Sequence, residues 1–303
     1  MKKLVLYLIG LTFFSCGDYY RDDYKDNSPT SGQLKVFCEE GLILHVGNQA
    51  LTFESQYPRA NIQVVGSNDM EAIQALYQDS CSGIIISREM SEDELKMFKS
   101  KNVTPRFSSI AYSGIALITS SASVIDSISL TQLRTNLTSN DSNQTAIRFI
   151  LPGNQSGITM FVKDSVCGNQ SFSSNVNSLN AELEVLKYVA EHQNVIGIVD
   201  YALIADRDDP IFKSYENAFK FIKVSRTSEK AEEPNPSTFK LGTYPLTRKL
   251  IYYRNSQEFS LSKGFEAFLA GPKGQLLFLK QGLLPFKQQE RNIEVKFEPM
   301  EVE

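Results

Sequence analysis

Histidine is scarce in this chain: only His45 and His192 occur among 303 residues. Hydrolytic triads and zinc sites usually contain histidine, so the sequence offers few residues for either. None of the four cysteines has the Cys-x-x-Cys or Cys/His spacing typical of a metal site. No run of lysine and arginine occurs either, and the formal charge is −4, which argues against nucleic acid as a partner. We therefore expect neither an enzyme nor a protein with a metal or cofactor.

The chain also lacks a membrane-spanning run, although its N-terminus is apolar. Residues 4–14 are hydrophobic, follow Lys2 and Lys3, and precede Cys16. Eleven residues are too few for a bilayer crossing, which needs about 20. The pattern predicts a lipoprotein signal peptide over residues 1–15, with lipid added to Cys16. An ordinary secretory signal with a chance cysteine is the alternative.

Either signal places the mature protein outside the cytoplasm. We expect it in the cell envelope, lipid-anchored in the periplasm or at the outer membrane or surface. Residues 16–32 are polar and lack periodicity, which predicts a flexible tether. Cleavage removes two lysines and no acid, so the formal charge falls from −4 to −6.

Three cysteines remain after lipidation, and an odd number cannot all pair. Buried free thiols are the favoured interpretation for Cys38, Cys81 and Cys167. A bridge between Cys38 and Cys81 is the alternative, because an oxidising compartment permits disulfides.

The first half of the body alternates short apolar strands with amphipathic helices. Strands are expected at 34–37, 62–65 and 84–86. A helix is expected over 41–55. Asn68 and Glu71 form a capping box at the start of a second helix, and Ser91 opens the acidic first turn of a third. This alternation of strands and helices predicts a parallel sheet with helices on both faces and right-handed crossovers.

The alternation resumes after residue 120. Helices are expected at 130–136, 156–166, 179–190 and 261–269, and strands at 147–151 and 195–199. A last helix begins at Pro272 and is stopped by Gly282. Residues 225–238 are polar and predict an exposed loop. An acidic stretch at 206–209 suggests a loop that ends a helix.

Several stretches of the body resemble, in the right order, the type II periplasmic solute-binding proteins of the phosphate-binding, PstS-like family. They are 110–118 (IAYSGIALI), 130–134 (LTQLR), 153–158 (GNQSGI), 194–199 (NVIGIV), 244–248 (YPLTR) with 251–253 (IYY), and 271–275 (GPKGQ) with 281–282 (QG). The resemblance covers most of residues 33–287.

The resemblance implies an α/β fold of two lobes, each a mostly parallel sheet flanked by helices, joined by two hinge crossings. Lobe 1 would take residues 33–111 and 239–303, and lobe 2 residues 121–238. The hinges would lie near 112–120 and 239–250. A small oxyanion would bind in the cleft, where helix N-termini and hydroxyls supply hydrogen bonds.

The resemblance also suggests which residues would bind the anion. The candidates are Gly41, Leu42, Ser67, Ser87, Arg88, Asn154, Ser156 and Gly157. Arg88 is the best single candidate for pairing an anion, although a surface arginine at a strand end explains it equally well. Helix capping alone accounts for Ser67. The adjacent carboxylates Glu39 and Glu40 would repel phosphate.

Three positions depart from the family pattern in ways that bear on the ligand. Ile158 stands where the family has threonine, Pro152 where it has arginine, and Asn154 where it has aspartate. Each charge-assisted hydrogen bond lost costs about 1.5–3 kcal/mol. Tight phosphate binding therefore does not follow from the fold.

Two functions remain open. The first is a lipid-anchored, monomeric receptor that passes phosphate or a related oxyanion to an ABC permease. The second is a cell-envelope module that keeps the fold, has lost phosphate binding, and recognises a protein partner or a different solute. An enzyme that uses a cation held by Asp200 and residues 206–209 is a distant third, because no nucleophile–base pair is visible.

Overall fold

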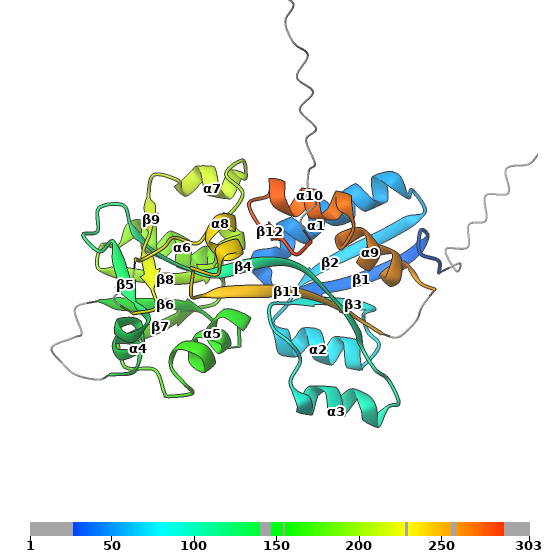
Figure 1. The fold of residues 1–303 in the computed structure, drawn as a ribbon, viewed down its shortest axis with the longest axis horizontal. Helices are drawn as coiled ribbons and strands as arrows, with labels where there is room; N and C mark the ends of the chain where they lie inside the picture. Colours follow the sequence, from blue (N-terminus) through cyan, green and yellow to red (C-terminus); the bar gives the residue numbers. More distant parts are fainter. Residues whose placement is uncertain (1–26, 140–146, 154, 228–229, 256–258, 288–303) are drawn as a thin grey trace, which may run out of the picture.

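The computed structural model describes residues 27–139, 147–153, 155–227, 230–255 and 259–287. The predicted signal peptide, Cys16 and most of the tether lie outside these residues. Two bodies of packed helices and strands lie side by side, joined by two long strands (Figure 1). Within the described ranges no helix combines the length and hydropathy needed to cross a bilayer.

The first body is built on three parallel strands. These are β1 (Gly32–Cys38), β2 (Ala60–Gly66) and β3 (Gly83–Ile86), in the order β2-β1-β3. Helices α1 (Ile43–Gln56), α9 (Leu261–Leu269) and α10 (Pro272–Lys280) lie on one side of the strands, and α2 (Asp69–Tyr77) and α3 (Glu92–Ser100) on the other (Figure 1). A short 3-10 turn, η1 (Glu40–Leu42), connects β1 to α1.

The second body repeats this design with another parallel set. Its strands are β6 (Arg148–Pro152), β7 (Val176–Leu179) and β8 (Val195–Asp200), in the order β8-β6-β7. Its helices are α4 (Leu130–Thr138), α5 (Gly157–Phe161), α6 (Glu182–Glu191), α7 (Pro210–Tyr215) and α8 (Pro236–Leu241). A π turn, η3 (Val162–Val166), extends α5, and a 3-10 turn, η4 (Tyr201–Ile204), follows β8. Short strands β5 (Ser127–Ser129), β9 (Phe219–Phe221), β10 (Lys223–Ser225) and β12 (Leu284–Pro285) complete the elements that the structure describes.

The bodies are joined by β4 (Arg106–Ser120) and β11 (Thr247–Arg254), which pair antiparallel. The N-terminal part of β4 lies beside β11, and its C-terminal part pairs with β8. One continuous sheet, in the order β2-β1-β3-β11-β4-β8-β6-β7, therefore runs through both bodies. The mixed α/β fold with mostly parallel strands and flanking helices is as the sequence predicts.

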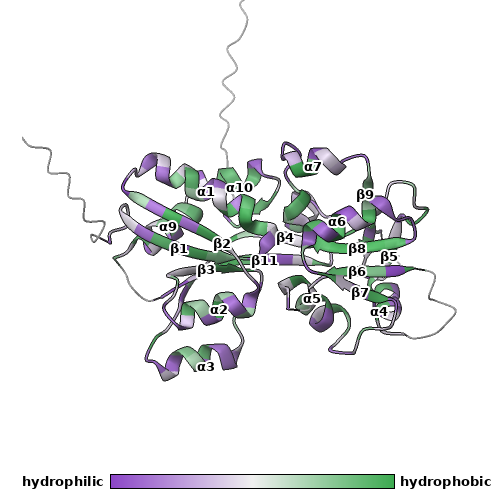
Figure 2. Cartoon of the chain, turned by 180° about the vertical axis from the view of Figure 1, so that it is seen from behind, coloured by the Kyte–Doolittle hydropathy of each residue, from purple (hydrophilic) through white to green (hydrophobic). Residues whose placement is uncertain are grey.

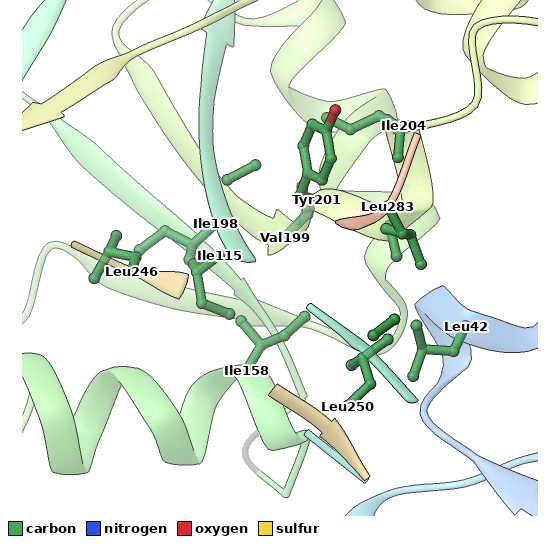
Figure 3. Close-up of a cluster of buried hydrophobic side chains, with 14 of the residues drawn as sticks. Leu42, Ile115, Ile158, Ile198, Val199, Tyr201, Ile204, Leu246, Leu250 and Leu283 are labelled. Atoms are coloured by element: carbon green, nitrogen blue, oxygen red, sulfur yellow. The ribbon is translucent and has the colours of Figure 1, made fainter. Parts of the chain in front are cut away.

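The apolar core also continues from one body into the other. Figure 2 shows the central strands largely hydrophobic and the outer helices mixed in character. In Figure 3, Leu42 of η1, Ile158 of α5, Ile115 of β4 and Leu250 of β11 belong to one cluster of buried side chains. The two bodies therefore meet through apolar packing where β4 and β11 pass between them.

Most local predictions are confirmed. The capping boxes of Asn68 with Glu71 and of Ser91 with Glu94 are both present. Gly282 takes a positive φ of 82° just after α10, where glycine is favoured. Cys38, Cys81 and Cys167 are buried free thiols, so the alternative bridge is absent.

The acidic stretch at 206–209 is a loop after the 3-10 turn η4, as predicted, and Asp209 also caps the start of α7 through the N–H groups of Ile211 and Phe212. Two local predictions are wrong. The helix expected at 179–190 begins only at Glu182, because Leu179 is the last residue of β7 and pairs with Pro152. The loop expected at 225–238 is interrupted by a bridge between Val224 and Glu232 and by α8.

We expect Phe265→Ala to lower the free energy of unfolding by about 3–5 kcal/mol. Phe265 is fully buried and meets the rings of Phe53 and Tyr252 edge-on, at centroid distances of 5.7 and 6.1 Å. Urea unfolding followed by circular dichroism measures the loss. Phe259→Ala is the control, because Phe259 is 72% exposed and its removal should change stability by no more than about 0.5 kcal/mol. Equal losses in the two variants would contradict this account of the core.

Candidate functional site

A cavity of about 500 Å³ opens between the two bodies. The first body contributes the residues that follow β1 and β2, and the second the residues around the start of α5 and α6. The lining is Glu39, Glu40, Gly66, Ser67, Asn68, Glu71, Pro152, Gly153, Gln155, Ser156, Gly157, Ile158, Asn180 and Glu182. Elements from both halves of the chain thus enclose one site.

The start of α5 forms one wall of the cavity. Ser156 is the N-cap, and its hydroxyl accepts a hydrogen bond from the Thr159 N–H at 3.1 Å. The Thr159 hydroxyl donates to the Pro152 carbonyl at 2.8 Å, which fixes the turn between β6 and α5. Gly157 is buried and lines the cavity.

Glu39, the residue after β1, occupies the innermost part of the site. Its side chain is almost completely buried and accepts hydrogen bonds from both the backbone N–H (3.0 Å) and the hydroxyl of Ser87. Arg248 of β11 donates to both carboxylate oxygens through Nη2, each at 2.6 Å. A backbone N–H, a hydroxyl and a guanidinium are the donors that proteins use to hold an oxyanion. Here a carboxylate of the chain itself receives them.

The Glu39 carboxylate also lies against the second body. A Cβ atom placed on Gly157 would stand 2.9 Å from Glu39 Oε1 and 3.0 Å from Asp69 Oδ1. Any larger residue would collide with these oxygens, so glycine is required at the start of α5. The first body therefore inserts two carboxyl groups at the helix start that lines the cavity.

Arg248 is shared between Glu39 and Asp200, the last residue of β8. Its Nη1 donates to Asp200 Oδ2 at 3.2 Å, while the Ser113 hydroxyl and the Ala202 N–H donate to Asp200 Oδ1 at 2.6 and 2.7 Å. Burial raises the pKa of Asp200, and Arg248 opposes that rise. Burial would likewise raise the pKa of Glu39, but Arg248 and Ser87 hold it below its usual value.

Glu182 of α6 bridges the two bodies. Its carboxyl group accepts from the Gly41 N–H at 3.2 Å and from the Asp200 N–H at 2.8 Å. Burial, followed by the nearby Asp200, raises the pKa of Glu182 to about 8. Glu182 is therefore mostly protonated at neutral pH.

Asp69 is the fourth buried carboxyl group of the site. Its Oδ2 accepts from Arg88 Nε at 3.0 Å, whereas its Oδ1 has no donor of its own. Burial, followed by the charge of Glu39, raises the pKa of Asp69 to about 7. A proton on Oδ1 is then shared with Glu39, and this hydrogen bond helps to lower the pKa of Glu39. The four buried carboxyl groups of Glu39, Asp69, Glu182 and Asp200 thus lie around the buried guanidinium of Arg248.

Comparison with known proteins identifies the family. A model of the PBP superfamily domain matches residues 25–273. The chain belongs to the PBP superfamily. No curated protein matches the sequence.

Solved structures with the same fold share little sequence with this PBP superfamily chain. A substrate-binding protein from Clostridium perfringens, with bound phosphate, is similar with a TM-score of 0.70 at 17% identity, over 84% of this chain and 100% of its own. An ABC-type phosphate transport receptor from Vibrio cholerae gives a TM-score of 0.65 at 16% identity, with coverage of 84% and 100%. PstS from Borrelia burgdorferi gives 0.54 at 18%, with coverage of 84% and 99%. At these identities the likeness shows the fold alone.

The structure brings most of the predicted site residues to one place, but engages many of them with the chain itself. Ser67, Ser156 and Gly157 line the cavity. The Gly41 N–H donates to Glu182, and the Leu42 N–H to the Glu39 carbonyl. Ser87 donates to Glu39. Asn154 lies outside the described residues.

Arg88, the predicted anion partner, is held by acids instead. It donates to Asp69 and, through Nη1 and Nη2, to the two carboxylate oxygens of Glu94, both at 2.8 Å. The hydrogen bonds to Glu94 are the main reason that its pKa is raised. It is not part of the cavity lining.

Sequence reasoning missed the buried residues that organise the site. Arg248, Asp69, Glu182 and Ser113 were not singled out as site residues, and Asp200 only as a ligand for a cation. Arg248 does end the YPLTR stretch, and Asp200 directly follows the apolar NVIGIV strand. The position of a charged residue at the end of an apolar strand could therefore have indicated Arg248 and Asp200 as site residues.

We expect Asp69→Asn to stabilise the protein at pH 8 by about 1–3 kcal/mol, and to flatten its pH dependence. An acid whose pKa is raised by folding contributes stability at low pH, which is lost as the pH rises through the raised value. For Asp69 this loss of stability extends from its ordinary pKa of 3.8 to its raised pKa of about 7. Asparagine keeps an acceptor for Arg88 and offers Glu39 a permanent donor.

Urea unfolding at pH 5 and pH 8 measures this effect. Asp93→Asn is the control, because Asp93 is exposed and pairs only with Lys96 at the surface. The same change in stability between the two pH values in wild type and Asp69→Asn would show that Asp69 does not titrate as described.

Proposed function

We propose that this chain is an extracytoplasmic, lipid-anchored solute-binding protein that has lost phosphate binding and takes a different solute. Membership of the PBP superfamily supports solute binding as the general role. The observation that carries the loss is the Glu39 carboxylate, which receives hydrogen bonds from Ser87 and Arg248. A phosphate at this position would have to displace a buried, ion-paired side chain.

Electrostatics and packing support the same conclusion. Besides Glu39, the carboxyl groups of Asp69, Glu182 and Asp200 are buried around the site. Arg248 is paired with Glu39 and Asp200, so its positive charge is already compensated and is not available to an anion. Ile158, at the position of a family threonine, is buried in the apolar cluster between the two bodies and offers no hydroxyl (Figure 3).

The position of the tether is compatible with anchoring through Cys16. The Asn27 side chain accepts a hydrogen bond from the Leu261 N–H at 2.8 Å, at the start of α9. A Cβ on Gly264 would lie only 1.7 Å from the Pro29 carbonyl oxygen, so residues 27–29 pack closely on α9. Residues 27–29, the first that the structure describes, are therefore fixed against α9.

A second candidate, a receptor for phosphate or a related oxyanion that supplies an ABC permease, has one observation in its favour. Ser67 and Ser156 both line the cavity, and the Ser67 hydroxyl is nine-tenths buried without a partner in the described part of the chain. Hydroxyls of this kind can donate to an anion. In addition, the similar structure from Clostridium perfringens contains bound phosphate, and the one from Vibrio cholerae is a phosphate transport receptor.

Calorimetric titration with phosphate and sulfate separates the two candidates. Cys16→Ser gives a chain without the lipid, and we expect this protein to release no binding heat with either anion at neutral pH. Micromolar phosphate binding that is weakened in Ser156→Ala would overturn the proposal and establish the second candidate.

Removing the internal carboxylate should restore an anion site. In Glu39→Ser, the Ser87 donors and Arg248 lose their partner, so we expect sulfate to raise the melting temperature of this variant and not that of wild type. Glu40→Ser is the matched control, since Glu40 is the exposed neighbouring acid. If sulfate stabilises all three proteins alike, Glu39 does not occupy an anion position.

Lipid attachment is tested in cells. We expect the wild-type protein to partition into the detergent phase of a Triton X-114 extract, and Cys16→Ser to remain in the aqueous phase. Cys38→Ser is the control, because Cys38 is buried in the folded body. Aqueous partitioning of the wild-type protein would favour an ordinary secretory signal.

A further inference from the structure

The ionisable side chains that line the cavity are all carboxylic acids. Glu39, Glu40, Glu71 and Glu182 belong to its lining, and none of the lining residues is lysine or arginine. Glu40 and Glu71 are exposed, and among the described residues neither forms an ion pair with lysine or arginine. Their charges therefore remain available to a ligand, unlike that of Glu39, which Arg248 neutralises.

A second, independent feature is a buried hydroxyl that a ligand could satisfy, and the acidic lining decides which kind of ligand that is. The Ser67 hydroxyl is nine-tenths buried, belongs to a lining residue and has no hydrogen-bond partner among the residues that the structure describes. A buried hydroxyl without a partner costs free energy unless a ligand or water satisfies it. A hydroxyl oxygen accepts hydrogen bonds, and an ammonium group has three donors and no acceptor.

We propose that this cavity binds a small organic cation with a primary ammonium group, which would contact Glu40 and Glu71 at the mouth and donate to the Ser67 hydroxyl within. This inference names the solute class of the proposed function and rests on it. The cavity volume of about 500 Å³ suits a small molecule and far exceeds a bare ion. The described residues contain no group of three or more His, Cys, Asp or Glu side chains placed to hold a metal.

The buried groups behind the lining do not oppose a cation. Asp69 and Asp200 lie near Glu39 and Glu182, and Arg248 is the only guanidinium buried among them in the described part of the chain. Arg248 is paired with Glu39 and Asp200, so its positive charge is already compensated. The exposed carboxylates of Glu40 and Glu71 would attract a cation and repel an anion.

The test compares two compounds of the same length by calorimetry on the Cys16→Ser protein. Putrescine carries a primary ammonium group at each end, and butane-1,4-diol carries hydroxyls instead. We expect saturable binding of putrescine that weakens as salt is added, and no binding of the diol. Phosphate is titrated in parallel, because phosphate binding would overturn the proposed function, whereas silence with putrescine would overturn only the cation site.

Variants of the lining place the site. We expect Glu40→Gln and Glu71→Gln each to weaken putrescine binding about fivefold. Ser67→Ala should weaken it as well, although it removes no charge. Glu92→Gln, an exposed acid in the first turn of α3, is the matched control and should leave the affinity unchanged. Equal effects of Glu92→Gln and Glu40→Gln, or no effect of Ser67→Ala, would show attraction to the general acidic surface and overturn the proposal.

Discussion

The ion pair between Glu39 and Arg248 is the contact around which the two bodies are arranged. Glu39 follows β1, its donor Ser87 follows β3, Arg248 lies on β11, and Arg248 also binds Asp200 at the end of β8. Four strands from both bodies thus meet at one guanidinium and two carboxylates. Removing one partner from such a buried group leaves a charge without compensation, which typically costs about 3–5 kcal/mol. The geometry of the cavity depends on this contact.

The same contact explains how one fold can serve a different chemistry. In this chain the donors at the strand ends are satisfied by Glu39, so the fold does not need a bound anion to satisfy them. The cavity is lined in part by the exposed acids Glu40 and Glu71. A fold that is shared with phosphate-binding proteins therefore does not imply a phosphate site.

The sequence predicted the elements well where local rules decide them. Asn68 and Ser91 were recognised as helix caps because capping needs only residues three positions apart. The start of α6 was misplaced because Leu179 fits a helical stripe but pairs with Pro152 of β6, a contact between distant residues. The site, too, is organised by contacts between residues that are distant in the sequence. Arg248 and Glu39 are 209 positions apart, and no periodicity connects them.

The two bodies make polar and apolar contacts with each other across the site. The Gly41 N–H of the first body donates to Glu182 of the second, and Glu39 lies against Gly157. Ile158 and Leu42 add apolar contact at the same place (Figure 3). In a binding protein that closes on its ligand, the ligand supplies part of the attraction between the lobes. Here side chains and backbone groups of the two bodies make contacts of this kind with each other directly.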